Sequence, residues 1–257
     1  RRVERLTNNL IDLESQTRRE YKRSMLYAAL SGRIGRGLVG RDAEVHTLVN
    51  QLQSDVISHT LVIGSSGVGK SSLVQVALEQ AIDQAVWDVE RIVWINSPHS
   101  SEVVTAELNR KLLPHASITD VFAWLRVLRC VIVLDGIGEL YHRGDLNDLL
   151  QKLKFSHVVC TSDQIVPFHT STSHLHLVAL SSDASYKLIQ RRANEIIPSR
   201  HLDNDEIDYI FQCTGGNPLA ICAYVSLWLQ GEDALDEDTL DGLLGHHIVK
   251  LDNASYR

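Results

Sequence analysis

The chain has 257 residues, of which 44% are apolar, enough for one α/β domain with a helical appendage. Its formal net charge of −7 provides no overall attraction to nucleic acid or to an anionic membrane. It contains no run of about 18 apolar residues, which excludes a membrane-spanning helix, and no signal peptide is visible.

The charge is unevenly distributed along the chain. Residues 1–36 hold nine Lys or Arg and four Asp or Glu, so this segment is basic and the remainder is acidic. A basic arm can touch RNA, lipid or an acidic partner, but a solvated helix face is the more common explanation. Nucleic acid is therefore not expected as a partner.

The four cysteines are not arranged as CxxC pairs, and each has apolar neighbours. We interpret them as reduced core residues of a cytoplasmic protein. The chain begins with Arg and contains one Met, so we expect it to be a fragment of a longer protein.

Hydrophobic periodicity and glycine-rich breaks predict the following elements in chain order. The pattern gives helices at about 1–30, 41–53, 70–84, 101–113, 119–128, 181–196, 203–213 and 217–230, and strands at about 60–63, 92–95, 130–134, 157–161 and 175–177.

Strands that alternate with helices favour a parallel sheet covered on both faces. The predicted fold class is therefore α/β, with a P-loop parallel sheet flanked by helices and followed by a small helical domain. The predicted divisions are an N-terminal helix and linker (1–36), a P-loop nucleotide-binding domain (37–180), a helical domain (181–230), and a linker or the start of a further helical or winged-helix module (231–257).

A phosphate-binding loop follows the first predicted strand of the sheet. Gly64-Ser-Ser-Gly-Val-Gly-Lys70-Ser71 fits G-x-x-x-x-G-K-S/T without a mismatch. Its glycines allow backbone N–H groups to point at phosphates, and the N-terminus of the next helix adds a partial positive charge. The motif assigns the β- and γ-phosphates to Lys70 and a Mg²⁺ ligand to the Ser71 hydroxyl.

A second acidic group is expected on a neighbouring strand, where it would help to hold the metal. Asp135 ends the apolar run Cys130-Val-Ile-Val-Leu134, so it is predicted to lie at the nucleotide-binding edge and to be a metal and catalytic residue. Glu139 follows four residues later, and it is either the base that orients the attacking water or a solvated residue at a helix start.

Four segments between about 37 and 230 resemble the STAND NTPases, which include apoptosome ATPases, NLR immune receptors and bacterial regulators. These segments run from Gly37 to Glu44, from Val93 to Ile95, from Leu134 to Glu139 and from Cys213 to Ala220. The last contains Gly-Asn-Pro-Leu-Ala, which is similar to the family's GxPLA motif.

The resemblance implies that Val39 and Arg41 lie against the nucleotide base and that Pro218 contacts the base and helps to hold ADP. No Asn-Lys-x-Asp guanine signature occurs, which also favours adenine. The predicted nucleotide-binding residues are Val39, Arg41, Gly64, Ser65, Ser66, Gly67, Val68, Gly69, Lys70, Ser71, Ser72 and Pro218, with Ser71 and Asp135 as the Mg²⁺ ligands.

Two departures from the family concern catalysis. Gly136 and Gly138 stand where members often carry a further acid, and the fourth strand ends Cys160-Thr-Ser-Asp163, where members commonly have an arginine. Both changes would leave charge on the γ-phosphoryl poorly stabilised, so weak or absent ATP hydrolysis is predicted.

We therefore expect an ATP/ADP-binding regulatory switch of a signalling protein, in innate immunity or apoptosis, whose ATP state forms homo-oligomers. Effector and sensor domains would lie outside this fragment. The alternatives are an active AAA+ ATPase of the origin-recognition type that acts on DNA, and a degenerate module in which nucleotide is only structural. DNA binding would require a basic patch.

Overall fold

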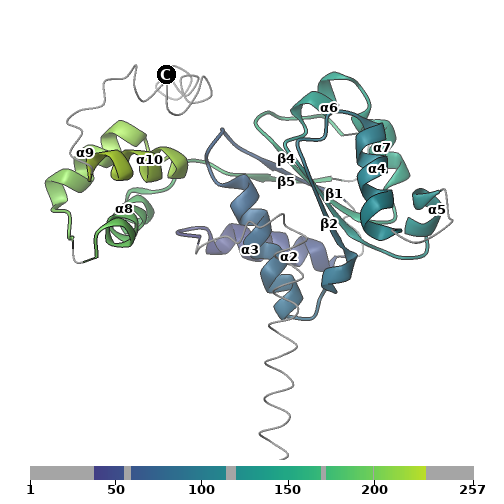
Figure 1. The fold of residues 1–257 in the computed structure, drawn as a ribbon, viewed down its shortest axis with the longest axis horizontal. Helices are drawn as coiled ribbons and strands as arrows, with labels where there is room; N and C mark the ends of the chain where they lie inside the picture. Colours follow the sequence, from purple (N-terminus) through teal and green to yellow (C-terminus); the bar gives the residue numbers. More distant parts are fainter. Residues whose placement is uncertain (1–37, 55–58, 114–119, 169–171, 199, 230–257) are drawn as a thin grey trace, which may run out of the picture.

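Five strands form an all-parallel sheet in the spatial order β2-β3-β4-β1-β5 (Figure 1). The computed structural model describes residues 38–54, 59–113, 120–168, 172–198 and 200–229. The strands are β1 (His59–Ile63), β2 (Ile92–Asn96), β3 (Val131–Asp135), β4 (His157–Ser162) and β5 (Thr172–His176). Because β4 lies between β1 and β3, the carboxyl ends of these three strands are neighbours.

Each face of the sheet is covered by its own set of helices (Figure 1). Val62 and Val133 point into one apolar core, whereas their neighbours Leu61 and Ile132 point into the other, as the two-residue period of a strand requires. The first core contains α2 (Asp42–Gln53) and α3 (Lys70–Asp83); the second contains α4 (Ser101–Leu112), α5 (Val121–Leu125), α6 (Gly138–His142) and α7 (Leu146–Lys152).

Three further helices pack around a separate apolar core. They are α8 (Ser182–Ile196), α9 (Asn204–Thr214) and α10 (Pro218–Trp228). Asp203 and Glu206 form a capping box at the start of α9, and Gly215 ends the helix with a left-handed φ of 55°. Asn217 then caps α10 immediately, with Pro218 in its first turn, so a very short connection sets the entry of α10.

The structure confirms the predicted fold class, a parallel sheet flanked by helices and followed by helical structure. The predicted helix ranges include none between the third and fourth strands, where only a helix start near Glu139 was considered; α6 and α7 lie there. Both are too short for a periodic pattern to stand out, and Gly136, Gly138 and Gly144 favour a loop in this stretch.

The predicted N-terminal helix and linker and the predicted module at 231–257 lie outside the described residues. Within the described part of the chain, no helix has the length and apolar character needed to span a membrane. The interpretation of all four cysteines as core residues is wrong for Cys213, which is exposed; Cys130 and Cys160 are buried, and Cys222 is half-buried.

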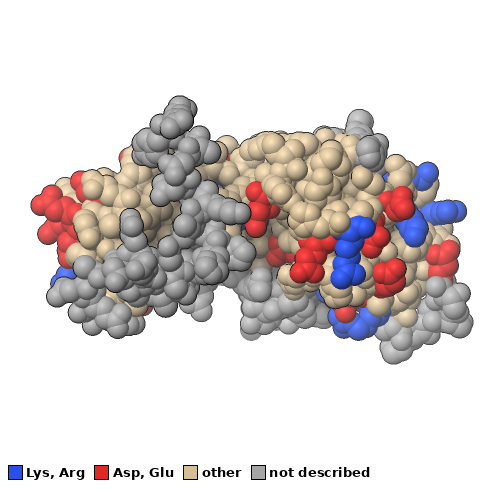
Figure 2. All heavy atoms as spheres, turned by 90° about the horizontal axis from the view of Figure 1, so that it is seen from above, with Lys and Arg blue, Asp and Glu red and all other residues tan. Residues whose placement is uncertain are grey.

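Figure 2 shows one charged face of the molecule from above. Asp and Glu side chains gather at the outer end of the α8–α10 domain, whereas acidic and basic side chains are interspersed over the P-loop domain. Among the described residues, this face presents no continuous basic surface of the kind that a DNA-binding domain displays.

Candidate functional site

The loop between β1 and α3 has the backbone shape of a phosphate cradle. Gly67 and Gly69 have φ values of 77° and 101°, which residues with a side chain rarely adopt. A Cβ on Gly64 would lie 2.6 Å from the Leu177 carbonyl oxygen, so this position has no room for a side chain. The loop leads directly into α3, whose first N–H groups therefore face the space above it.

A cavity of about 490 Å³, with Ser, Thr, Asp and Lys side chains in its wall, opens above this loop. The Lys70 Nζ atom lies at its floor and donates to Gly64 O at 2.7 Å, to Ser65 O at 3.0 Å and to Asp163 Oδ1 at 2.5 Å. An ammonium group held beneath the loop can bind phosphate oxygens as a point charge. The described lining comprises Ser66, Gly67, Gly69, Lys70, Ser71, Ser72, Ser97, Asp135, Gly136, Thr161, Asp163, Pro218, Leu219 and Cys222.

Ser71 and Asp135 come together at the same cavity. The Ser71 Oγ donates to Asp135 Oδ1 at 2.8 Å, and the Thr161 Oγ1 donates to the same oxygen at 2.7 Å. Thr161 in turn accepts from the Gly136 N–H at 2.8 Å, which fixes its hydroxyl. A hydroxyl and a carboxylate at this separation fit a Mg²⁺ ion, which takes one or two protein oxygens beside water and phosphate.

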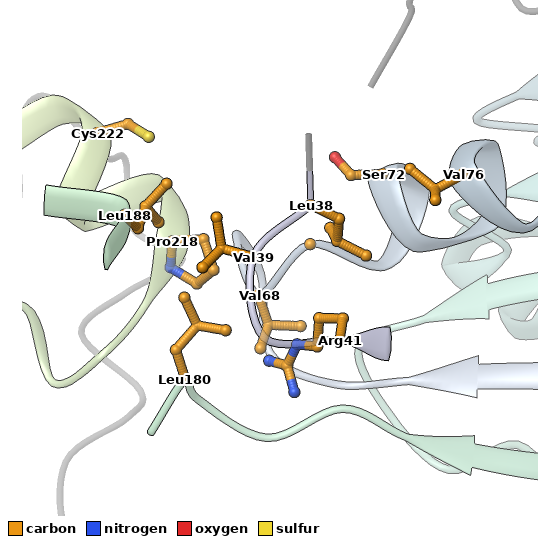
Figure 3. Close-up of a pocket in the computed structure, with 11 residues that line it drawn as sticks. Leu38, Val39, Arg41, Val68, Ser72, Val76, Leu180, Leu188, Pro218 and Cys222 are labelled. Atoms are coloured by element: carbon orange, nitrogen blue, oxygen red, sulfur yellow. The ribbon is translucent and has the colours of Figure 1, made fainter. Parts of the chain in front are cut away.

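A second, mostly apolar cavity of about 140 Å³ adjoins the loop on its other side (Figure 3). In Figure 3 its walls come from the segment before α2, from the phosphate loop with α3, from the connection between β5 and α8, and from α8 and α10. An apolar slot beside the phosphate cavity suits a purine ring. The lining residues are Leu38, Val39, Arg41, Val68, Gly69, Ser72, Val76, Leu180, Leu188, Pro218 and Cys222.

Arg41 ties together two segments at this cavity. Its guanidinium is buried, donates to Glu44 Oε1 at 3.0 Å and also donates to the Val178 carbonyl. The segment before α2 is therefore fastened to the connection that runs from β5 to α8. With its donors engaged in this way, Arg41 holds the wall of the cavity in place.

Helix α10 contacts the phosphate loop directly. The Asn217 Nδ2 donates to Ser66 O at 2.9 Å, and the Leu219 N–H donates to Gly67 O at 3.3 Å. Pro218, between them, lines both cavities. The start of α10 therefore closes over the loop and joins the two domains through main-chain carbonyls.

The comparisons with known proteins agree with this geometry. The sequence profile described as the AAA ATPase domain matches residues 37–185, more than half of the chain. This chain belongs to the AAA ATPase domain family. A search of curated proteins found no match.

Several solved structures resemble this AAA ATPase domain at low sequence identity. A Walker-type ATPase of Pyrococcus abyssi has 17% identity and a TM-score of 0.59, with 80% of this chain and 71% of that chain covered. The ORC1 protein of Aeropyrum pernix, solved in complex with DNA, has 17% identity and a TM-score of 0.58, with 84% of this chain and 68% of that chain covered.

A STAND protein of Pyrococcus horikoshii with a tetratricopeptide repeat sensor has 17% identity and a TM-score of 0.54. The alignment covers 82% of this chain but only 33% of that one. At these identities the likeness shows a shared fold.

Most of the residues expected at the nucleotide lie at one of the two cavities of this AAA ATPase domain. Gly64 and Ser65 are not in either lining, but their carbonyls hold Lys70. Glu139 lies exposed in the first turn of α6 and is not among the described lining residues, so its role as a base stays a prediction.

Sequence reasoning assigned no role to Thr161, Asn217 or Ser97, and it noted Asp163 only as a departure from the family. Thr161 and Asp163 stand at the end of a predicted strand, so their position gave a signal. Asn217 sits inside the resemblance segment beside Pro218, whereas Ser97 follows β2 without any motif.

Proposed function

We propose that this AAA ATPase domain is the ATP/ADP-binding switch module of a STAND-type signalling protein. In this proposal ADP holds the sheet domain and the α8–α10 domain together, and ATP with Mg²⁺ favours an open form that self-associates. Hydrolysis is slow or absent. Effector and sensor domains would belong to other parts of the protein.

The observation that carries this proposal is the contact between α10 and the phosphate loop. Asn217 and Leu219 bind the carbonyls of Ser66 and Gly67, the loop that would hold the nucleotide. A nucleotide that alters this loop or the space above it therefore acts directly on the helical domain. A ligand shifts an equilibrium between two forms only by binding them unequally, and this contact offers such a difference.

The composition of the phosphate cavity supports slow hydrolysis. Lys70 is the one cation among its described lining residues, and the position after β4 holds Asp163. Stabilisation of charge on a transferring phosphoryl group commonly comes from Arg or Lys side chains, and removing one such group costs orders of magnitude in rate. We expect a turnover well below the ordinary enzyme range of about 1 per second and above.

The first experiment asks whether the site holds nucleotide. The purified chain is denatured, and any released nucleotide is identified by chromatography, for the wild type, for Lys70→Ala and for the matched control Lys187→Ala. Lys187 is exposed on α8. Bound ADP that is lost only in Lys70→Ala supports the proposal, whereas a wild type that binds no nucleotide after incubation with ATP and Mg²⁺ refutes it.

The second experiment asks whether nucleotide controls assembly. The ADP form is exchanged for ATP or a non-hydrolysable analogue with Mg²⁺, and the mass in solution is measured by light scattering after size-exclusion chromatography. A switch exchanges nucleotide and gains mass with the triphosphate. Exchange without any change in mass or shape contradicts the switch, and no exchange at all indicates a structural nucleotide.

A further inference from the structure

Asp163 is the first residue after β4 and reaches into the phosphate cavity from the carboxyl ends of the strands. Its Oδ1 lies 2.5 Å from the Lys70 Nζ. An ammonium group has three donors, and here two of them meet the loop carbonyls of Gly64 and Ser65. The third, which points at Asp163, is therefore the donor that an incoming phosphate oxygen must take over.

The charges around this donor are unfavourable for a further anion. Among the described lining residues of the phosphate cavity, Asp135 and Asp163 carry negative charge and Lys70 alone carries positive charge. Asp135 is committed to Ser71 and Thr161, at the position of a Mg²⁺ ligand. The Asp163 carboxylate faces the Lys70 ammonium instead.

The positions of the two cavities define how a bound nucleotide would run, from its base in the apolar cavity to its phosphates in the phosphate cavity. A purine in the apolar cavity beside Val39 and Pro218 would run its phosphates across the loop, and its last phosphate would arrive at Lys70. The P-loop lysine normally binds the β- and γ-phosphates. In this chain both phosphates would therefore reach Lys70, but only a triphosphate places a further negatively charged phosphoryl group beside the Asp163 carboxylate.

We propose that Asp163 is a specificity-determining residue that makes this site favour a nucleoside diphosphate over the triphosphate. Its carboxylate competes with the γ-phosphoryl for Lys70 and repels the additional negative charge. The inference rests on the proposed function, because it assigns a regulatory role to the same nucleotide site. It predicts a resting form that stays loaded with diphosphate while the Asp163 carboxylate carries its charge.

The size of the effect follows from the exposure of the carboxylate. Asp163 is 62% exposed, so its repulsion of an anion about 4 Å away is that of a charge near the surface, between the values in water and in a protein interior. Such an interaction corresponds to roughly a tenfold change in a binding ratio. It should weaken as salt is raised, because exposed charges are screened.

The test compares the affinities of ADP and of a non-hydrolysable ATP analogue, each with Mg²⁺, by displacement of a fluorescent ADP. The variants are Asp163→Asn, which keeps the shape and removes the charge, and Asp163→Arg, which reverses it. Asp88→Asn is the matched control. Asp88 also faces a basic side chain, Arg91, but it precedes β2 and so lies toward the amino ends of the strands, away from the phosphate cavity.

We expect the Kd of the ATP analogue divided by the Kd of ADP to fall about tenfold in Asp163→Asn and further in Asp163→Arg. Asp88→Asn should leave this ratio unchanged. An unchanged ratio in Asp163→Asn, in protein that binds both nucleotides, overturns the inference and leaves the proposed function standing. A ratio that rises also overturns it, because Asp163 would then assist the triphosphate. A wild type that binds neither nucleotide refutes the proposed function itself.

Discussion

Replacing Asn217 should weaken the connection between the phosphate loop and the helical domain. Its side chain is buried and has two roles: its Oδ1 accepts from the N–H groups of Leu219 and Ala220, and its Nδ2 donates to Ser66 O. Asn217→Ala removes both roles. Asn217→Asp keeps the accepting oxygen that caps α10 but cannot donate to Ser66, so the pair separates the cap from the interdomain contact.

The magnitude follows from the two contacts. Loss of a helix N-cap costs about 1 kcal/mol, and loss of one net hydrogen bond costs about 1 kcal/mol. Asn217→Ala should therefore lose about 2 kcal/mol, or a Tm decrease of about 4–8 °C for a domain pair of this size. Asn217→Asp should lose at least half of that, because the bond to Ser66 is removed and a buried carboxylate is placed opposite the Ser66 carbonyl oxygen.

The decisive assay is the rate at which fluorescent ADP dissociates, measured beside thermal unfolding. Both Asn217 variants should release ADP about fivefold faster, as a loss of about 1 kcal/mol implies. Asp203→Ala is the control, because it removes the comparable cap of α9 without touching the loop. If Asp203→Ala accelerates release as much as the Asn217 variants do, or if neither Asn217 variant accelerates it, the reasoning about a direct contact is refuted.

Further predictions concern the loop, the metal and the thiols. Gly67→Ala should displace the start of α10 from the phosphate loop and weaken ADP binding at least tenfold, because the new Cβ would lie 2.8 Å from Asn217 Oδ1 at a φ of 77°; unchanged affinity in calorimetry would contradict this. Asp135→Asn should abolish the dependence of ATP-analogue affinity on Mg²⁺, and a retained dependence would remove Asp135 from the metal site. Burial raises the pKa of Cys160 to about 12, so its stabilising contribution is fully present below the unfolded value of 9.0 and is lost as pH rises toward the folded one. Between neutral pH and about pH 10 the free energy of unfolding of the wild type should thus fall more than that of Cys160→Val, as measured by chemical denaturation, and parallel pH profiles would refute it. Burial also raises the pKa of the Cys222 thiol, which lines both cavities. Iodoacetamide at neutral pH should therefore label Cys222 more slowly than exposed Cys213, and slower still with bound ADP, as mass spectrometry can measure.

The parts of the site that sequence predicts well are local in the chain. The loop from Gly64 to Ser71 is a continuous motif, and its glycine positions report the backbone shape without knowledge of the rest of the fold. Asp135 was predicted from the apolar strand before it, and the structure brings it within 2.8 Å of Ser71. Two short sequence patterns sufficed because parallel strands align their carboxyl ends.

The contacts that were missed join segments far apart in the chain. Neither the sequence around Asn217 nor that around Ser66 reveals that the two will meet, because the meeting depends on how α10 packs against α8 and α9. The Lys70–Asp163 pair depends in the same way on the order of β1 and β4 in the sheet. Periodicity reports which face of an element is buried, but it does not report which neighbour buries it.

The hydrogen bonds from α10 to the phosphate loop end on carbonyl oxygens of the main chain, not on side chains. Substitutions at the variable positions of the loop can therefore accumulate without breaking this link, provided that the path of the backbone is kept. The same feature makes the link sensitive to orientation, because a rotation of the peptide plane between Ser66 and Gly67 would swing its carbonyl away from Asn217. The contact between the loop and α10 therefore depends on the backbone conformation of the loop and hardly on its side chains.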